Sequence, residues 1–292
     1  MKAALPRIIR RLTSVLPCPR IRHPVFIVGC GRSGTTILGT TLSHHPQVTY
    51  LNEHRHLWIA CYPETDIWSE EAPGRQGKLV LTKSDALENK SRRLHRLFRE
   101  EIDKTGRPVL IEKLPINSFR LEFIHHIFPD ARFIHIVRNG MEVARSIERR
   151  VNEGWYGAND YKWFQLARHA STLKGTASLP SLCTTDYDRG LLEWRLSTDA
   201  AHVFLSTLPD TIYMEIGYED FVEKPVQTIT TVLDFLGLEN NEVVNDFVRS
   251  TVWRKSEKAD FSRIPKKELT IGGRLLCQYR ERALRIGTDG KT

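Results

Sequence analysis

The sequence has no closely spaced pair of cysteines. Its five cysteines are single residues far apart in the chain: Cys18, Cys30, Cys61, Cys183 and Cys277. An odd number without a C-x-x-C pair argues against a disulfide framework and against a structural zinc site. Isolated cysteines of this kind are typical of proteins kept in a reducing compartment, so we predict a cytoplasmic protein.

Long apolar runs are also missing. No segment reaches the roughly 18 apolar residues that read as a membrane-spanning helix. Residues 1–22 are basic, but arginines and prolines interrupt the apolar residues, which does not fit a signal peptide. We predict a basic N-terminal tail over 1–22 and one domain over 23–292. A second interpretation of the tail is weak contact with an acidic membrane surface.

The chain lacks linkers rich in proline, glycine or serine, and it has no internal repeats. With 292 residues it is long enough for one large domain. Its formal net charge is +8, which suits a polyanionic ligand, an acidic membrane or nucleic acid. Zinc-finger spacing and RNP-like aromatic motifs are absent, so we predict no nucleic-acid partner. No pattern indicates an oligomeric state.

Short β-branched stretches alternate with stretches of helical periodicity. Strands are predicted over residues 24–28, 109–112, 132–137 and 211–216, and helices over 35–42, 120–128, 141–150 and 226–236, the last closing at Gly237. This alternation predicts the α/β class, with one parallel sheet flanked by helices. In such sheets ligands bind at the carboxyl ends of the strands.

The first predicted strand is followed by GCGRSGTT, residues 29–36. This segment nearly fits the P-loop pattern G-x-x-x-x-G-K-[ST], but Thr35 stands at the lysine position and the nearest cation is Arg32. Backbone N–H groups of such a loop can still bind an anion at a helix N-terminus. We therefore predict a P-loop-like anion site with these binding residues: Gly31, Arg32, Ser33, Gly34, Thr35 and Thr36.

The loop resembles the 5′-phosphosulfate loop of sulfotransferases that use 3′-phosphoadenylyl sulfate (PAPS). The resemblance continues in FIHIVRNGMEVARS, where Arg138 ends a strand and Ser146 follows eight residues later, and in YEDFVEKP, which begins at Tyr218. It implies that Arg138 and Ser146 bind the 3′-phosphate, since a guanidinium and a hydroxyl suit a phosphate dianion. It also implies that Tyr218 lies near the nucleotide. Arg150 or Arg149 would add a further phosphate contact.

Among sulfotransferases, the segment after the first helix is similar to that of the tyrosylprotein enzymes. A His-Pro pair is followed by Glu53 and, two residues on, by Arg55. The resemblance implies Glu53 as the general base. His54 and His56, expected on one face of an extended segment, are competing bases because cytosolic sulfotransferases use histidine, whose unperturbed pKa of about 6.5 suits the task.

A second cation follows the second predicted strand. Lys113, in the sequence Glu-Lys-Leu-Pro, resembles a Lys-x-Pro element of the same family that directs a lysine at the sulfuryl group. The catalytic residues predicted in this way are Arg32, Glu53 and Lys113. A sulfuryl group carries less charge than a phosphoryl group, so side-chain cations can suffice, and we predict no metal.

Two regions remain open. Basic residues near the C-terminus are candidates for covering the nucleotide: Ser262 with Arg263, Lys266, Lys267 and Arg274. The aromatic segment 155–164 lines the acceptor site, stacks on adenine or forms a local hydrophobic cluster.

The predicted function is transfer of the sulfuryl group of PAPS to an acceptor hydroxyl, which releases adenosine 3′,5′-bisphosphate. A carbohydrate, lipid or small natural product is favoured as the acceptor over protein tyrosine. A P-loop kinase or other NTPase is one alternative, although the lysine it needs is absent. The other alternative is a non-catalytic domain that binds a nucleotide or a sulfated glycan.

Overall fold

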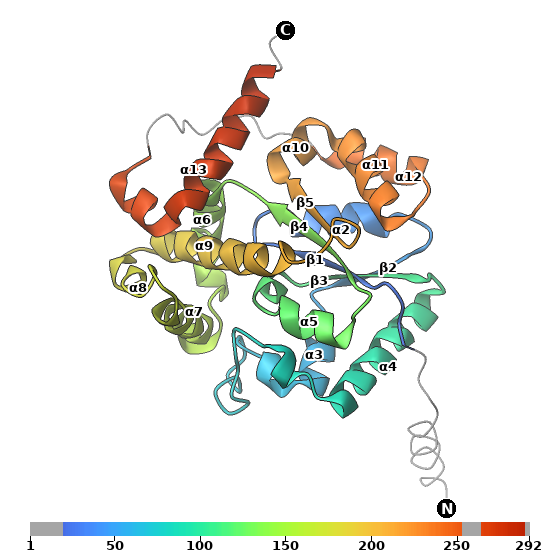
Figure 1. The fold of residues 1–292 in the computed structure, drawn as a ribbon, viewed down its shortest axis with the longest axis horizontal. Coiled ribbons are helices and arrows are strands. Elements are labelled where there is room, and N and C mark those ends of the chain that lie inside the picture. The colour runs from blue at the N-terminus through green and yellow to red at the C-terminus, as the bar shows by residue number, and fades with distance from the viewer. Residues whose placement is uncertain (1–19, 253–263, 290–292) are drawn as a thin grey trace, which may run out of the picture.

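The computed structural model describes residues 20–252 and 264–289, with side chains up to residue 279. At its centre lie five parallel strands in the order β2-β3-β1-β4-β5 (Figure 1). Their bounds are Val25–Val28 for β1, Val48–Asn52 for β2, Val109–Lys113 for β3, Arg132–Val137 for β4 and Tyr213–Gly217 for β5. The prediction of one parallel sheet flanked by helices is therefore confirmed, and four of the strands lie where the sequence indicated.

Strand β2 was not predicted. It is only five residues long and follows the first helix after a short turn, so in the sequence it is hard to distinguish from a connecting loop. Pairing with β3 along its whole length, from Val48 against Val109 to Asn52 against Lys113, stabilises it in the sheet. Tertiary pairing of this kind is not visible in a short local pattern.

Helices cover both faces of the sheet, as Figure 1 shows. One face carries α2 (Thr35–Ser43), α10 (Tyr218–Glu223), α11 (Pro225–Leu236) and α12 (Glu242–Thr251). The other carries α3 (Arg55–Cys61), α4 (Glu88–Thr105), α5 (Leu121–Ile127), α6 (Gly140–Glu148), α7 (Tyr161–Thr172), α8 (Leu179–Leu182), α9 (Asp186–Leu205) and α13 (Lys266–Asp289). All four predicted helices are present, and α11 ends at Gly237 in the left-handed conformation expected of a C-cap glycine.

The two hydrophobic cores meet at the central strand. In β1, Phe26 and Val28 join the core under α3, α4 and α9, whereas Val25 and Ile27 join the core under α2 and α11. Every residue of β1 is buried, as expected for a parallel strand covered on both faces. The turn that follows β1 is thus anchored by the most buried strand of the sheet.

Because all strands are parallel, their carboxyl ends lie at one edge of the sheet. Each strand ends at, or directly before, a segment singled out by the sequence: β1 before the glycine loop, β2 before Glu53, β3 at Lys113, β4 before Arg138 and β5 before Tyr218. From β1 the chain runs to β2 at one edge of the sheet, and after β3 it crosses to β4 on the other side of β1; ligands bind at such a change of direction in open α/β sheets. The fold therefore gathers the predicted site at one edge.

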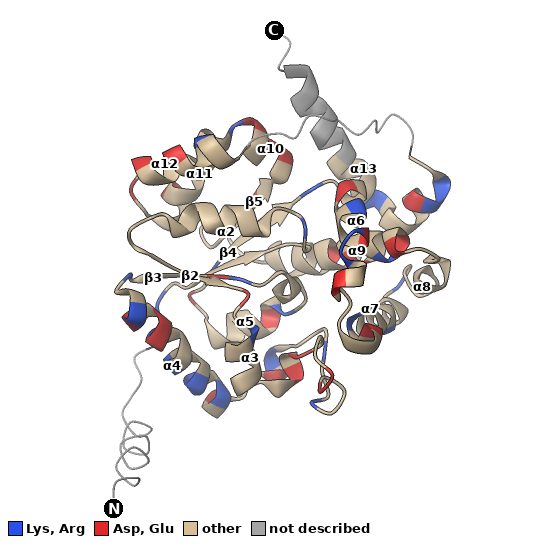
Figure 2. Cartoon of the chain, turned by 180° about the vertical axis from the view of Figure 1, so that it is seen from behind, with Lys and Arg blue, Asp and Glu red and all other residues tan. Residues whose placement is uncertain are grey.

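The surface and the N-terminal region add three observations. Lys and Arg predominate along the first part of α4, whereas Asp and Glu gather near its C-terminal end (Figure 2). Of the predicted basic tail, residues 1–19 lie outside the described part, while Ile21 is buried and its N–H donates to His95 Nδ1. No helix in the described part of the chain combines the length and the apolar character needed to cross a membrane.

A buried carboxyl lies in β3 directly before Lys113. Glu112 has no exposed surface, and its oxygens accept hydrogen bonds from Trp58 Nε1 and Asn117 Nδ2, both at 3.1 Å. Burial raises the pKa of Glu112 to about 8, although these hydrogen bonds oppose the shift. The side chain is therefore mostly protonated in the folded protein at neutral pH.

This raised pKa predicts how a glutamine would change stability. The unfolded chain ionises at its ordinary pKa near 4.5 and the folded protein only near 8, so the contribution of Glu112 to stability is lost as pH rises between these values. We expect Glu112→Gln to gain stability relative to wild type as pH rises from 5 to 8, with no further gain above 8. Thermal unfolding of both proteins across this pH range measures the difference in stability. A difference that does not change with pH would contradict the raised pKa of Glu112.

Candidate active site

The glycine loop connects β1 to the N-terminus of α2. Gly34, the N-cap, has φ 99°, and no side chain caps the helix. A side chain at Gly34 would overlap the ring of Tyr218, since an added Cβ would lie 2.4 Å from Tyr218 Cδ2. The free N–H groups of the first turn and the helix dipole together favour an anion at this end.

The hydroxyl groups of the loop do not all face the open side. Ser33 is buried, its N–H donates to the carbonyl oxygen of Cys30, and its Oγ has no partner in the described structure. Thr35 is also buried. Thr36 is exposed, and its Oγ1 accepts a hydrogen bond of 3.0 Å from Lys113 Nζ. Of these three hydroxyls, that of Thr36 is thus best placed to meet a ligand.

Two further arginines, Arg138 and Arg150, lie near Arg32 of the loop. Arg32 Nε donates to Ser146 Oγ at 3.0 Å, and Arg138 Nη1 donates to the Arg32 carbonyl at 3.4 Å. Burial, followed by the positive charges of Arg150 and Arg138, lowers the pKa of Arg32. Cations that depress one another's pKa are stabilised when an anion binds between them. The residues predicted from two separate motifs therefore lie together.

Arg138 has an acidic neighbour. Its Nε and Nη2 both donate to Glu142 Oε2, at 2.9 and 2.6 Å, one helical turn further along α6. Its guanidinium also lies over the ring of Tyr218, 4.4 Å from the centroid. Arg150 is paired similarly, with both carboxylate oxygens of Glu153. These pairs fix the guanidinium groups in place, and an anionic ligand would compete with the two carboxylates.

Glu53 lies between two cations at the end of β2. Its Oε1 accepts a hydrogen bond of 2.7 Å from Lys113 Nζ and its Oε2 one of 2.8 Å from Arg55 Nη2. Pairing of β2 with β3 sets this contact, because the N–H of Glu53 donates to the Lys113 carbonyl. Partial burial raises the pKa of Glu53, but Lys113 and Arg55 outweigh it, so the pKa is below its ordinary value.

Two of the predicted catalytic residues have unusual backbones. Glu53 has φ 55° and Arg32 has φ 74°, the left-handed region that side chains other than glycine rarely adopt. Lys113, by contrast, is in regular β-strand and is almost completely buried, so burial lowers its pKa although Glu53 opposes this. Among the three predicted catalytic residues, the strained backbones are therefore those of Arg32 and Glu53.

His54 and His56, the two histidines close to Glu53 in the sequence, do not lie at the candidate site. The expectation of an extended segment is wrong, because α3 begins at Arg55 with His54 as its N-cap. The His54 and His56 rings lie next to each other, with centroids 5.3 Å apart. Burial and the charge of His56 lower the pKa of His54. Glu53 lines the cavity described below, whereas neither histidine is among its lining residues in the described part of the chain.

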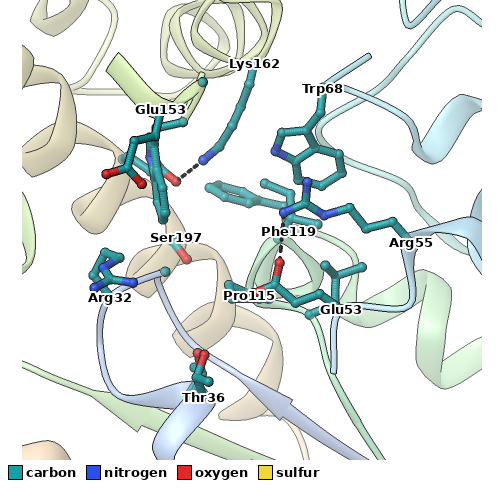
Figure 3. Close-up of a pocket in the computed structure, with 17 residues that line it drawn as sticks. Arg32, Thr36, Glu53, Arg55, Trp68, Pro115, Phe119, Glu153, Lys162 and Ser197 are labelled. Carbon is teal, nitrogen blue, oxygen red and sulfur yellow. Dashed lines mark hydrogen bonds and ion pairs between the residues drawn. The ribbon is translucent and has the colours of Figure 1, made fainter. Parts of the chain in front are cut away.

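A cavity of about 240 Å³ opens between these residues. In Figure 3, Glu53, Arg55 and Trp68 lie on one side of it and Arg32, Glu153 and Ser197 on the other, with Phe119 and Pro115 between them. Arg55 stacks on Trp68, with its guanidinium carbon 3.9 Å from the ring centroid. The cavity thus combines an aromatic wall with charged groups at the strand ends, a combination typical of small-molecule sites.

Sequence reasoning missed part of this cavity. Trp155 lay within the aromatic segment for which acceptor binding was one interpretation, and it does line the cavity. Trp68, Phe119, Glu193 and Ser197 were not singled out, since they belong to a loop, a 3₁₀ turn and the long helix α9. Only the spacing of Glu193 and Ser197, one helical turn apart, was available in the sequence to place them on one face.

The basic residues near the C-terminus differ in where they lie. Ser262 and Arg263 lie outside the described residues. Lys267 Nζ donates to Asp188 Oδ2 at 2.7 Å and to Thr184 Oγ1, so it attaches α13 to the start of α9. Lys266 and Arg274 are exposed. The cover over the nucleotide stays a prediction.

Metal-ligating side chains do not cluster in the described ranges. Among residues 20–252 and 264–289, no three His, Cys, Asp or Glu side chains lie close enough together to hold a metal ion.

Comparison with known proteins agrees with the geometry. The chain is 23% identical over 274 residues to nodulation protein NoeE of Sinorhizobium fredii, covering 87% of this chain and 58% of that protein. It is 26% identical over 224 residues to protein-tyrosine sulfotransferase 1 of Danio rerio, covering 75% of this chain and 54% of that protein. The chain thus spans only a little over half of each of these two relatives.

Solved structures share the fold. The crystal structure of the sulfotransferase STF9 from Mycobacterium avium matches with a TM-score of 0.50 and 13% identity, covering 97% of this chain and 81% of that chain. The model of the sulfotransferase family matches residues 24–242, which include the glycine loop and all five strands. On this match over most of its length, the chain belongs to the sulfotransferase family.

Proposed function

We propose that the protein transfers the sulfuryl group of PAPS to the hydroxyl of an acceptor and releases adenosine 3′,5′-bisphosphate. The observation that carries the proposal is the junction of the ends of β1 and β4, where Arg32, Arg138 and Ser146 come together. Membership of the sulfotransferase family supports the same donor. The second half of the site is Glu53, which lines the cavity together with Arg32 and pairs with Lys113 at the ends of β2 and β3.

The residues present fit a donor with two phosphate positions. The uncapped N-terminus of α2 and Arg32 would hold the 5′-phosphosulfate, since their charges and N–H groups favour an anion. Arg138 and Ser146 would hold the 3′-phosphate. Burial lowers the pKa of Arg32, and the charges of Arg150 and Arg138 lower it further, so an anion bound beside Arg32 would stabilise its charged form. When bound, the donor supplies an activated sulfuryl group.

The chain's own residues would then divide the chemistry. Glu53 takes the proton of the acceptor hydroxyl, while the acceptor oxygen forms a new bond to sulfur. The electrons of the broken S–O bond pass to the phosphate oxygen, where Arg32 and Lys113 stabilise the added charge. Lys113 is buried and already reaches both Thr36 and Glu53, so it links the base to the loop.

The pairing of Glu53 with two cations governs its strength as a base. In the structure Lys113 and Arg55 hold its pKa below the ordinary value, so Glu53 is ionised at neutral pH and able to accept a proton. Negative charge bound next to Lys113 would share that cation with Glu53 and raise the pKa of the carboxyl. The base would thus gain strength when the donor is in place.

The acceptor belongs to this proposal as well. We favour a carbohydrate, a lipid or a small natural product over protein tyrosine; a compact cavity with aromatic and charged walls can hold a small hydroxyl compound.

A kinase remains the first alternative. In a P-loop kinase the loop lysine contacts the β- and γ-phosphates and the Thr36 position binds Mg²⁺. Here Thr35 replaces that lysine, and the Thr36 hydroxyl is engaged by Lys113. The second alternative, a binding domain without turnover, is opposed by the contact between a carboxylate and a lysine at the reacting edge.

Calorimetric titration tests the donor site. We expect wild type to bind adenosine 3′,5′-bisphosphate without metal and more tightly than ATP with Mg²⁺. Arg138→Ala removes the guanidinium proposed to hold the 3′-phosphate and should weaken binding by about 10²-fold or more. The matched control is Arg145→Ala, which removes an exposed arginine from α6, the helix that follows Arg138, and should bind like wild type.

Other results would reject the proposal in distinguishable ways. Preference for ATP with Mg²⁺, or binding indifferent to Arg138, would favour the kinase. Tight binding of the bisphosphate without transfer to any alcohol, phenol or water would favour the binding domain.

A further inference from the structure

Trp155 lies between the glycine loop and the cavity. A Cβ added to Gly31 would lie 2.5 Å from Trp155 Cη2 and 2.9 Å from Cζ2, so the indole packs directly on the loop backbone beside Arg32. Trp155 also lines the cavity that contains Arg32, Thr36 and Glu53. The ring therefore forms a wall that touches both the anion-binding loop and the space in which an acceptor would react.

A buried ion pair holds this ring. Glu193 Oε2 accepts a hydrogen bond of 2.8 Å from Trp155 Nε1, and its Oε1 accepts one of 2.6 Å from Lys162 Nζ. The ammonium group of Lys162 also lies 4.3 Å from the centroid of the Trp155 ring. The side chains of Lys162 and Glu193 are only 5% and 4% exposed. The indole is thus fixed at its N–H by one residue and at its face by another.

Stability alone is a poor reason for such a pair. Taking two charges out of water costs several kcal/mol per ion, and the attraction between them often does no more than offset that cost. One oxygen of Glu193 accepts from the indole N–H of Trp155, and the other accepts from Lys162, which packs against the indole face. The arrangement is therefore better suited to holding one side chain in a defined position than to stabilising the fold.

We propose that Trp155, positioned by Glu193, shields the donor's sulfuryl group from water while the cavity awaits an acceptor. This inference rests on the proposed sulfuryl transfer. Water is the competing acceptor: its oxygen would form the new bond to sulfur, the S–O bond to the phosphate would break, and sulfate, the bisphosphate and the two protons of the water would be released. An aromatic wall beside the reacting group excludes that water and leaves the donor for the acceptor hydroxyl.

The test measures hydrolysis of PAPS without any acceptor, together with the affinity for adenosine 3′,5′-bisphosphate. Trp155→Ala opens the wall and should raise hydrolysis about tenfold, because closed sites protect reactive groups from water. The affinity for the bisphosphate should stay within about twofold of wild type. Trp155→Phe keeps an aromatic ring and should lie between the two, which guards against misinterpreting a poorly folded alanine variant.

The role of Glu193 is tested through Trp155. Glu193→Gln should raise hydrolysis several-fold in wild type but add nothing in the Trp155→Phe background, which has no indole N–H to orient. Such non-additivity is the mark of one residue acting through another. Trp163→Phe is the matched control, since this tryptophan packs on Tyr156 and is not among the cavity's lining residues in the described chain.

Three results would overturn the inference. Unchanged hydrolysis in Trp155→Ala would show that the ring excludes no water. A tenfold or larger loss of bisphosphate affinity would place Trp155 in nucleotide binding instead. Equal effects of Glu193→Gln in both backgrounds would separate Glu193 from Trp155. Failure of wild type to bind the bisphosphate would be a different result, because it rejects the sulfotransferase proposal itself.

Discussion

Glu53→Gln is expected to lower kcat for sulfuryl transfer by about 10²–10⁴, the range supplied by general-base catalysis. Glutamine keeps the size of the side chain and an oxygen that can accept from Lys113 or Arg55, but it cannot take up the acceptor's proton. The affinity for adenosine 3′,5′-bisphosphate should remain near that of wild type. The measurement is the rate of transfer from PAPS to an alcohol or phenol acceptor found by screening.

The neighbouring histidines give this result its control. His54 and His56 are the competing bases in sequence terms, yet Glu53 lines the cavity and pairs with Lys113. His54→Asn and His56→Asn should therefore keep turnover within about threefold of wild type, as substitutions outside the reacting site do. A large loss in either histidine variant, with activity kept in Glu53→Gln, would reassign the base.

Lys113→Met should have the second large effect, a fall in kcat of about 10²–10³, as expected when a preorganised charge at the transition state is removed. It should also shift the acid side of the pH profile of kcat/KM, which reports the pKa of the free enzyme's base. In wild type the pKa of Glu53 lies below 4.5, because Lys113 and Arg55 outweigh burial. Without Lys113 burial gains weight, so activity should be lost at a higher pH as the solution is acidified.

Arg55→Met distinguishes the loss of transition-state stabilisation from the shift in the pKa of Glu53. Arg55 also lowers the pKa of Glu53, through a contact of 2.8 Å, but it comes from α3 and not from β3. Its loss should move the acid limb upward in the same direction with a much smaller loss of kcat. If both variants moved the limb and lowered kcat equally, Lys113 would have no function beyond setting the charge of Glu53.

The parallel sheet and the grouping of the predicted residues could be foreseen from the sequence. Parallel strands bring their carboxyl ends to one edge, so Arg32, Lys113 and Arg138 had to lie near one another once their strands were identified. Ser146 likewise lies on α6, the helix that directly follows Arg138, and its hydroxyl accepts a hydrogen bond from Arg32. Local sequence patterns are enough to predict the position of a residue when that position follows from the strand or helix on which it lies.

Other features depend on contacts between distant segments. Strand β2 is defined by its pairing with β3, and Trp68 reaches the cavity through a loop whose shape is set by its packing. Arg120 illustrates this, since its buried guanidinium donates to the carbonyls of Thr65, Lys78 and Leu79 and so ties that loop to the start of α5. No periodicity in residues 63–82 encodes these contacts, so the aromatic side of the cavity could not be predicted.

The left-handed backbone at Arg32 and Glu53 has a consequence for how this protein can change. Each such residue costs on the order of 1–2 kcal/mol relative to an unstrained conformation, whereas glycine adopts it freely. At these two positions the substitution that most relaxes the chain is also the one that deletes the chemistry. Selection for heat resistance alone would therefore enrich inactive variants here, and keeping both side chains requires that the gain in robustness come from elsewhere in the protein.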